Sequence, residues 1–131
     1  MIAADSSSLI AYFQGDSGSD VEAIAEAVAG EILRLPPVVV TELLSDEAAR
    51  ARLLPVIAGL PKLELGAGFW ERAGATRGLL RAKGLKAKIP DVLIAQSCID
   101  HDIALISRDE DFKHFVMHCG LRLHLGIAPG I

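Results

Sequence analysis

Short apolar segments alternate along this chain with longer segments in which apolar residues recur at helical spacing. The short segments predict strands, and they lie at residues 1–4, 32–35, 62–65, 103–106 and 121–125. The segment 103–106 reads I-A-L-I. An unbroken apolar run of this length is typical of a strand buried on both faces of a parallel sheet.

The segments between these runs predict helices. In residues 21–29 the apolar Val21, Ile24, Ala25 and Val28 fall at i, i+3, i+4 and i+7, which is one face of a helix. The same kind of evidence, with proline and serine start signals, predicts helices at 9–13 behind the capping serines Ser6–Ser8, and at 21–29, 38–45, 46–58, 69–82, 90–102 and 110–118. The segment 38–45 is ambiguous, because its β-branched run also suits a strand.

The order of these elements predicts an α/β fold. Strands that alternate with helices form a parallel sheet covered on both faces, with right-handed crossovers. We therefore expect a three-layer α/β/α sandwich with a central, mostly parallel sheet of four to five short strands. The length of 131 residues predicts a single domain over residues 1–131, and the 51% hydrophobic content predicts a packed core.

The apolar runs also bear on the compartment. None approaches the roughly 18 residues that cross a bilayer, and residues 1–5 lack the basic start of a signal peptide. We therefore expect a cytoplasmic protein with no membrane partner. In that compartment Cys98 and Cys119 should be reduced and packed, with Cys98 in the core rather than acting as a nucleophile.

Charge is distributed unevenly over a chain of net charge −4. Six basic residues follow one another with no acidic residue between them: Arg72, Arg77, Arg81, Lys83, Lys86 and Lys88. Such a run is often one solvated helix face. It is also what a strip that contacts nucleic-acid phosphates looks like. The sequence leaves both interpretations open.

Four carboxylates come from separate segments. Asp5 and Asp109 each follow a predicted strand, where ligands bind in open α/β sheets, and Asp91 begins a helix. Taken singly, these three are explained by helix capping. Glu42 lies among valines and leucines, where a carboxylate is costly to bury unless it is paired or bound. Together the four indicate an all-oxygen site for a hard divalent cation, Mg²⁺ or Mn²⁺.

Four segments in this order resemble the PIN-domain ribonucleases, and more narrowly the VapC-type toxins of bacterial toxin–antitoxin pairs. They are Asp5-Ser6-Ser7, the solitary Glu42, P-D-V-L-I-A at 90–95 and S-R-D-E-D-F at 107–112. The resemblance covers essentially the whole chain and implies a PIN-like fold.

This resemblance also implies roles for individual residues. The acidic quartet Asp5, Glu42, Asp91 and Asp109 would be catalytic and would bind Mg²⁺ or Mn²⁺. The auxiliary residues would be Ser7, Ser107 and Asp111, although Asp111 could equally be a helix-start charge. The implied activity is a metal-dependent endoribonuclease that acts as a toxin, with a cognate antitoxin and a homodimer as partners. The RNA backbone would then contact the basic strip, at Arg77, Arg81, Lys83, Lys86 and Lys88.

Other interpretations keep a place beside this one. His114, His118 and Cys119 have a spacing that zinc sites use, but no further ligand pattern is visible. An acidic phosphoacceptor domain would use Asp5 or Asp109, yet no partner lysine and hydroxyl switch can be placed. A PIN fold could also serve as a binding module without nuclease activity. Glycine-rich nucleotide-binding motifs are absent from the sequence.

Overall fold

Three short parallel strands form the centre of the sheet in the computed structural model, which describes residues 1–124. β1 (Ile2–Ala4) lies between β2 (Leu33–Arg34) and β3 (Ala104–Ile106). Ala4 pairs with Ile106, and both are almost completely buried. The residues that follow them, at the carboxyl ends of β1 and β3, therefore lie next to each other.

The outer strands are shorter than the sequence predicts. Within residues 1–124 the segments 62–65 and 121–125 do not form full strands. Each contributes one parallel bridge, between Leu35 and Lys62 and between Leu105 and Leu123. Pro61 has no N–H to extend the first bridge, and Leu125 lies outside the described residues. The sheet thus has three strands in this part of the chain, with one bridge at either edge, instead of four to five strands.

The order of pairing places a switch point at the centre of the sheet. From β1 the chain builds outward through β2 to the bridge at Lys62, then returns to add β3 on the other side of β1. In open α/β sheets ligands bind at such a reversal, beyond the carboxyl ends of the two strands. The loops after β1 and β3 occupy this position.

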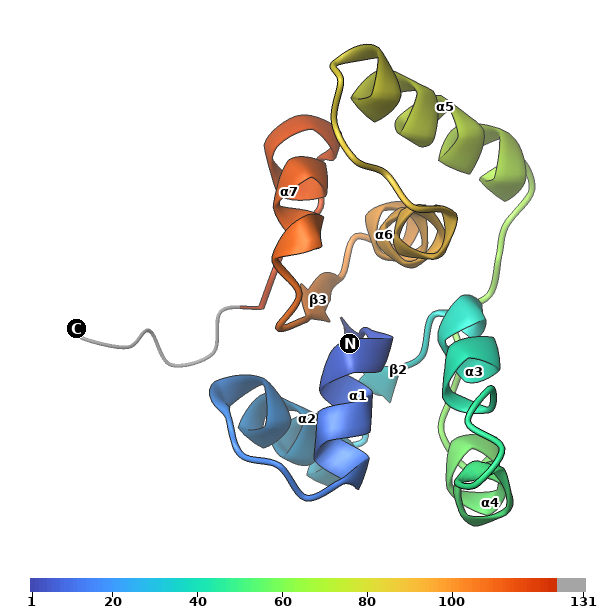
Figure 1. The fold of residues 1–131 in the computed structure, drawn as a ribbon, viewed down its shortest axis with the longest axis vertical. Coiled ribbons are helices and arrows are strands. Elements are labelled where there is room, and N and C mark those ends of the chain that lie inside the picture. The colour runs from blue at the N-terminus through green and yellow to red at the C-terminus, as the bar shows by residue number, and fades with distance from the viewer. Residues whose placement is uncertain (125–131) are drawn as a thin grey trace, which may run out of the picture.

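Helices cover both faces of the sheet, as predicted. Figure 1 shows α1 (Ser6–Phe13) and α2 (Ser19–Ala29) on one side and α6 (Ile89–His101) on the other. α5 (Phe69–Ala82) packs on the outside of α6, and α7 (Lys113–Cys119) packs against α5. The three-layer α/β/α sandwich is confirmed.

The remaining elements resolve the ambiguous segments. The segment 38–45 is mostly helical: α3 (Pro37–Leu43) has proline in its first turn, where no N–H is needed, and a turn follows it. The helix expected at 46–58 begins later, as α4 (Arg50–Ala58), after a turn. The helix expected at 110–118 opens with one 3₁₀ turn, η1 (Glu110–Phe112), that runs directly into α7.

One helix start differs from the prediction in a way that matters for the site. The helix expected at 9–13 begins at Ser6, and Asp5 caps it instead of the serines. A carboxylate is a strong acceptor for the free N–H groups of a first turn. The prediction placed the cap one to three residues too late, so Asp5 is fixed by the helix start itself.

The core confirms the placement of the cysteines. Cys98 is fully buried and free, and burial raises the pKa of its thiol to about 12, so it is no nucleophile. Cys119 is also free and half-buried. Among the helices of residues 1–124, none is long and apolar enough to cross a membrane.

Candidate metal centre

Asp5 is the most enclosed carboxylate of the chain's described part. Its Oδ1 accepts a 3.0 Å hydrogen bond from the backbone N–H of Ser8, and its Oδ2 accepts one of 2.9 Å from the Ser7 hydroxyl. Burial raises the pKa of Asp5, while these hydrogen bonds and one from Ser107 act in the opposite direction. Within residues 1–124 its donors are hydroxyl and amide groups, and it forms no ion pair with a basic side chain.

Ser107 connects Asp5 to the loop after β3. Its hydroxyl donates to Asp5 Oδ2 at 2.7 Å and accepts from the backbone N–H of Asp109 at 3.0 Å. A hydroxyl can do both at once because it carries one donor and two acceptor positions. The sequence prediction of an auxiliary serine here thus receives a specific geometry, although its role in a reaction stays a prediction.

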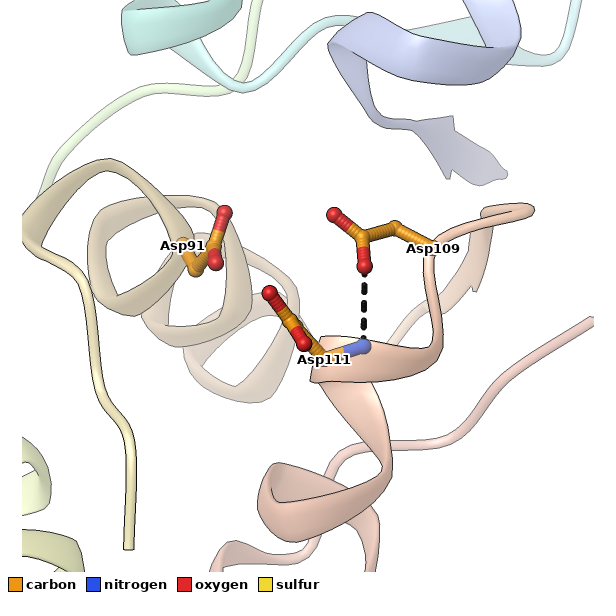
Figure 2. A group of neighbouring side chains, drawn as sticks. All are labelled: Asp91, Asp109 and Asp111. Carbon is orange, nitrogen blue, oxygen red and sulfur yellow. Dashed lines mark hydrogen bonds between the residues drawn. The ribbon is translucent and has the colours of Figure 1, made fainter.

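Asp109 and Asp111 are fixed by a tight turn. Asp109 caps η1, and its Oδ1 accepts a 2.9 Å hydrogen bond from the backbone N–H of Asp111. The interpretation of Asp109 as a helix cap is therefore correct for its Oδ1. Within residues 1–124 the second oxygen of Asp109 forms no hydrogen bond or ion pair, and Figure 2 shows the Asp109 and Asp111 side chains on the side of the loop that faces α6.

Asp91 lies on α6, which faces the turn of Asp109 and Asp111. It lies in the first turn of α6, after a proline, where a carboxylate is favoured by the helix dipole. Burial and then the charges of Asp109, Asp111 and Glu42 together raise its pKa to about 6, against the lowering effect of Lys88. Each neighbouring carboxylate disfavours a further negative charge beside it, which is why these groups raise the pKa of Asp91.

The three aspartates Asp91, Asp109 and Asp111 form one cluster, which we call the acidic trio. One carboxylate oxygen from each lies within 4.8 Å of the others. All three side chains are half-buried, and Figure 2 shows them converging on one space between α6 and the loop. Oxygens from several carboxylates around one point are the donor set of a hard divalent cation, so the residues fit Mg²⁺ or Mn²⁺.

Glu42 lies at the edge of this cluster. Its Oε1 accepts a 2.7 Å hydrogen bond from the hydroxyl of Ser6, and its charge contributes to the raised pKa of Asp91. The sequence showed Glu42 as an unpaired acid among apolar residues. The partner it finds is the first residue of α1, which no local pattern in the sequence could identify.

The structure thus divides the predicted quartet. Asp91 and Asp109 lie together with Asp111, which sequence reasoning had treated as auxiliary. Asp5 is joined to the loop of the trio through Ser107, and Glu42 lies outside the trio, with a hydrogen bond from Ser6. Which of the five bind a cation stays a prediction, but the geometry places Asp111 in the same position as Asp91 and Asp109.

The basic strip is not one uniform face. Arg72 pairs with Asp100 at 2.6 Å, and Arg77 donates to the carbonyl of Ala87 at 2.8 Å, so both hold the α5–α6 region together. Lys86, by contrast, reaches Asp111 with an Nζ–Oδ2 distance of 3.2 Å. The remaining members are exposed: Arg81, Lys83 and Lys88.

The loop that carries the trio is also held by a long-range ion pair that the sequence does not predict, which we call the clamp. Arg108, between Ser107 and Asp109, forms hydrogen bonds of 2.6 and 3.0 Å to both oxygens of Asp20 at the start of α2. Arg108 Nη2 also donates to the carbonyl of Ser17 at 3.2 Å. The residues are 88 positions apart, so only the fold reveals the pair. The clamp fixes the position of the loop at Arg108, next to Asp109.

The zinc alternative finds no support in the geometry. Within residues 1–124 the acidic trio is the one group of three or more potential ligands that lie close enough to share an ion. His114, His118 and Cys119 therefore lack a converging third position there. The chemistry of the described site is that of oxygen ligands.

Comparisons with known proteins agree with this geometry. The family model described as "PIN domain" matches residues 2–116, which include every carboxylate discussed above. No curated protein matches the sequence.

A solved structure extends the comparison to the fold. It is the crystal structure of VapBC2 from Rickettsia felis bound to a DNA fragment from their promoter. The alignment has a TM-score of 0.74 at 21% sequence identity and covers 95% of this chain and 98% of that chain. The two chains share their fold over nearly their whole length.

Proposed function

The chain belongs to the PIN-domain family, and from that premise we propose that it is a metal-dependent endoribonuclease, which hydrolyses phosphodiester bonds of RNA with Mg²⁺ or Mn²⁺ at the acidic trio. The observation that carries the proposal is the convergence of Asp91, Asp109 and Asp111 at the switch point of the sheet. A divalent cation there would lower the pKa of a bound water and absorb negative charge on the scissile phosphate.

The chain's own residues prepare that position. Asp91 comes from α6, whereas Asp109 and Asp111 come from the loop after β3, so the site depends on the packing of α6 against β3. Asp5 and Ser107 support the loop from the β1 side. These supports hold the carboxylates in place before any substrate binds, which limits the reorganisation that the reaction requires.

Substrate binding would use the basic residues that the fold leaves exposed. Arg81 and Lys83 form no ion pair within residues 1–124, and Lys88 is the residue just before α6, three positions from Asp91. Cations at this distance favour the polyanionic RNA backbone without reading its sequence. We assign Arg72 and Arg77 to structural contacts instead.

We further propose that the protein is the toxin of a toxin–antitoxin pair and acts in the cytoplasm. Support comes from the shared fold with VapBC2 and from the motif order that resembles VapC-type toxins. The proposed partners are a cognate antitoxin protein and a second copy of this chain in a homodimer.

Cleavage of a labelled single-stranded RNA tests the activity. We expect cutting with Mn²⁺ or Mg²⁺, none in EDTA, and a loss in Asp109→Asn above the roughly 10–100-fold typical of outer-sphere partners. Glu110→Gln is the matched control, because Glu110 is exposed in the same turn and outside the trio. Absence of cleavage with every divalent metal would contradict the proposal and favour a PIN fold used for binding alone.

A further inference from the structure

Lys86 is the one basic side chain within residues 1–124 that is ion-paired to the acidic trio. It lies in the segment between α5 and α6, and its Nζ is 3.2 Å from Asp111 Oδ2. The lysine side chain is 56% exposed and that of Asp111 is 37% exposed. The pair therefore lies at the open side of the site, where a substrate would approach.

An ammonium group and a divalent cation compete for this position. A hard cation would bind the trio at about 2.0–2.1 Å from its oxygens, which brings a charge of +2 next to the charge of Lys86. Asp111 has a second oxygen, so both could touch it, but the two positive charges repel at such a separation. A divalent cation neutralises two of the three negative charges that the ionised trio carries, so it weakens the attraction between Asp111 and Lys86.

The Lys86 side chain can move away from Asp111. Its ammonium is a compact charge on a flexible four-carbon stem, and within residues 1–124 the pair with Asp111 is its one salt bridge. A phosphate that is bound at the trio would place its own oxygens at the same open side. Released from Asp111, Lys86 would find a new anionic partner there.

We propose that Lys86 is an exchangeable counter-ion of the site: it binds Asp111 in the metal-free protein and moves to a phosphate oxygen of bound RNA when a divalent cation occupies the trio. This inference rests on the proposed function, since it assumes that the trio binds a cation and that RNA is the substrate. It assigns Lys86 to substrate positioning and separates it from the other residues of the basic strip.

Direct measurement of Mn²⁺ binding to the full chain, without RNA, tests the first half. Lys86→Met should bind Mn²⁺ up to about fivefold more tightly, the range that an exposed ion pair allows. Lys86→Arg, which keeps the charge, should stay near wild type. Lys83→Met removes a charge from the same segment without contact to the trio, and should also stay near wild type. Unchanged or weaker Mn²⁺ binding by Lys86→Met would overturn the exchange.

Binding of a phosphorothioate RNA, measured by fluorescence anisotropy, tests the second half. Lys86→Met should weaken binding in Mn²⁺ and leave it unchanged in EDTA, where the wild-type lysine is held by Asp111. Lys83→Met should weaken binding equally in both. Equal weakening by Lys86→Met in both conditions would overturn the inference.

Different results of the Mn²⁺-binding experiment would contradict the proposed function and the role of Lys86. If wild type and Asp91→Asn both bind no Mn²⁺, the proposed function and the role of Lys86 are overturned together. If wild type binds Mn²⁺ and Asp91→Asn does not, while Lys86→Met behaves like wild type, the role of Lys86 alone is overturned.

Discussion

The hydroxyl of Ser107 donates a 2.7 Å hydrogen bond to Oδ2 of Asp5, across 102 positions of the chain. The bond joins the carboxyl ends of β1 and β3, where the order of the strands along the sheet reverses. It also ties the buried acid to the loop that carries Asp109, because the same hydroxyl accepts from the Asp109 amide. One side chain therefore contributes both to the burial of Asp5 and to the position of the loop that carries Asp109.

Removal of the Ser107 hydroxyl should lower the free energy of unfolding. In Ser107→Ala, Asp5 keeps its partners at Ser7 and Ser8 but loses a donor to a buried carboxylate. We expect the free energy of unfolding to fall by about 1–3 kcal/mol, measured by urea denaturation at pH 7. Ser107→Thr keeps the hydroxyl and should lose less. Equal losses in the two variants would show that volume, and not the hydrogen bond, decides stability here.

The clamp between Arg108 and Asp20 requires a glycine at position 18. Gly18 has φ +143°, and a Cβ there would lie 2.6 Å from Asp20 Oδ1 and 3.1 Å from Arg108 Nη2. We expect Gly18→Ala to destabilise the protein by more than about 1 kcal/mol. Gly15→Ala is the control, because Gly15 also has a positive φ, +76°, but has open space around it. A smaller loss for Gly18→Ala than for Gly15→Ala would contradict the clamp.

Asp91 gives the metal-free protein a predictable pH dependence. Its pKa is about 6 in the folded protein against an ordinary value of 3.8, so its protonated form favours the folded state. Its stabilising contribution is complete below about pH 3.8 and is lost as the pH rises through 6. Asp91→Asn stays neutral and lacks this loss.

The stability difference between Asp91→Asn and wild type should therefore shift in favour of the variant as the pH rises from 4 to 7. Urea denaturation in EDTA at several pH values measures it, and carboxylates that do not interact with Asp91 largely cancel in the comparison. A constant difference would show that the Asp91 carboxyl does not carry a raised pKa. Addition of Mn²⁺ should shift the difference at pH 7 back in favour of wild type, because a bound cation stabilises the protein that retains the ligand.

The turn that carries Asp109 and Asp111 is anchored by an aromatic pair. Phe112 and Phe115 are each 1% exposed, and their ring centroids are 5.9 Å apart. We expect Phe112→Ala to cost about 3–5 kcal/mol of the free energy of unfolding, measured by thermal or chemical denaturation. Met117→Ala, at a position that is 72% exposed on α7, should change it by less than about 0.5 kcal/mol. A loss below 1 kcal/mol for Phe112→Ala would contradict this anchoring.

Local signals in the sequence were sufficient for much of the fold. The unbroken run before Ser107 predicted β3 to within one residue, and Pro90 with Asp91 marked the start of α6 just as closely. Both depend on interactions within a few residues: burial of a short run and the chemistry of a helix start. The PIN resemblance added the order of the acids.

Long-range partners were not accessible in the same way. Nothing near Glu42 indicates that Ser6 binds it, and nothing near Arg108 indicates Asp20, because those contacts exist only after the sheet has formed. The predicted lengths of the edge strands were wrong for a related reason. Their length depends on how far a neighbour extends, and near Lys62 the neighbouring strand offers hydrogen bonds for a single bridge.

The proposed reaction depends on a divalent cation bound between Asp91, Asp109 and Asp111. Crystals of the full chain grown with Mn²⁺, and measured for anomalous scattering at the manganese edge, locate such an ion directly. We predict the strongest anomalous peak at about 2–2.5 Å from oxygens of at least two of the three carboxylates, and its absence in Asp91→Asn. A well-ordered trio with no peak at millimolar Mn²⁺, or a principal peak elsewhere in the chain, would contradict the metal centre and the nuclease built on it.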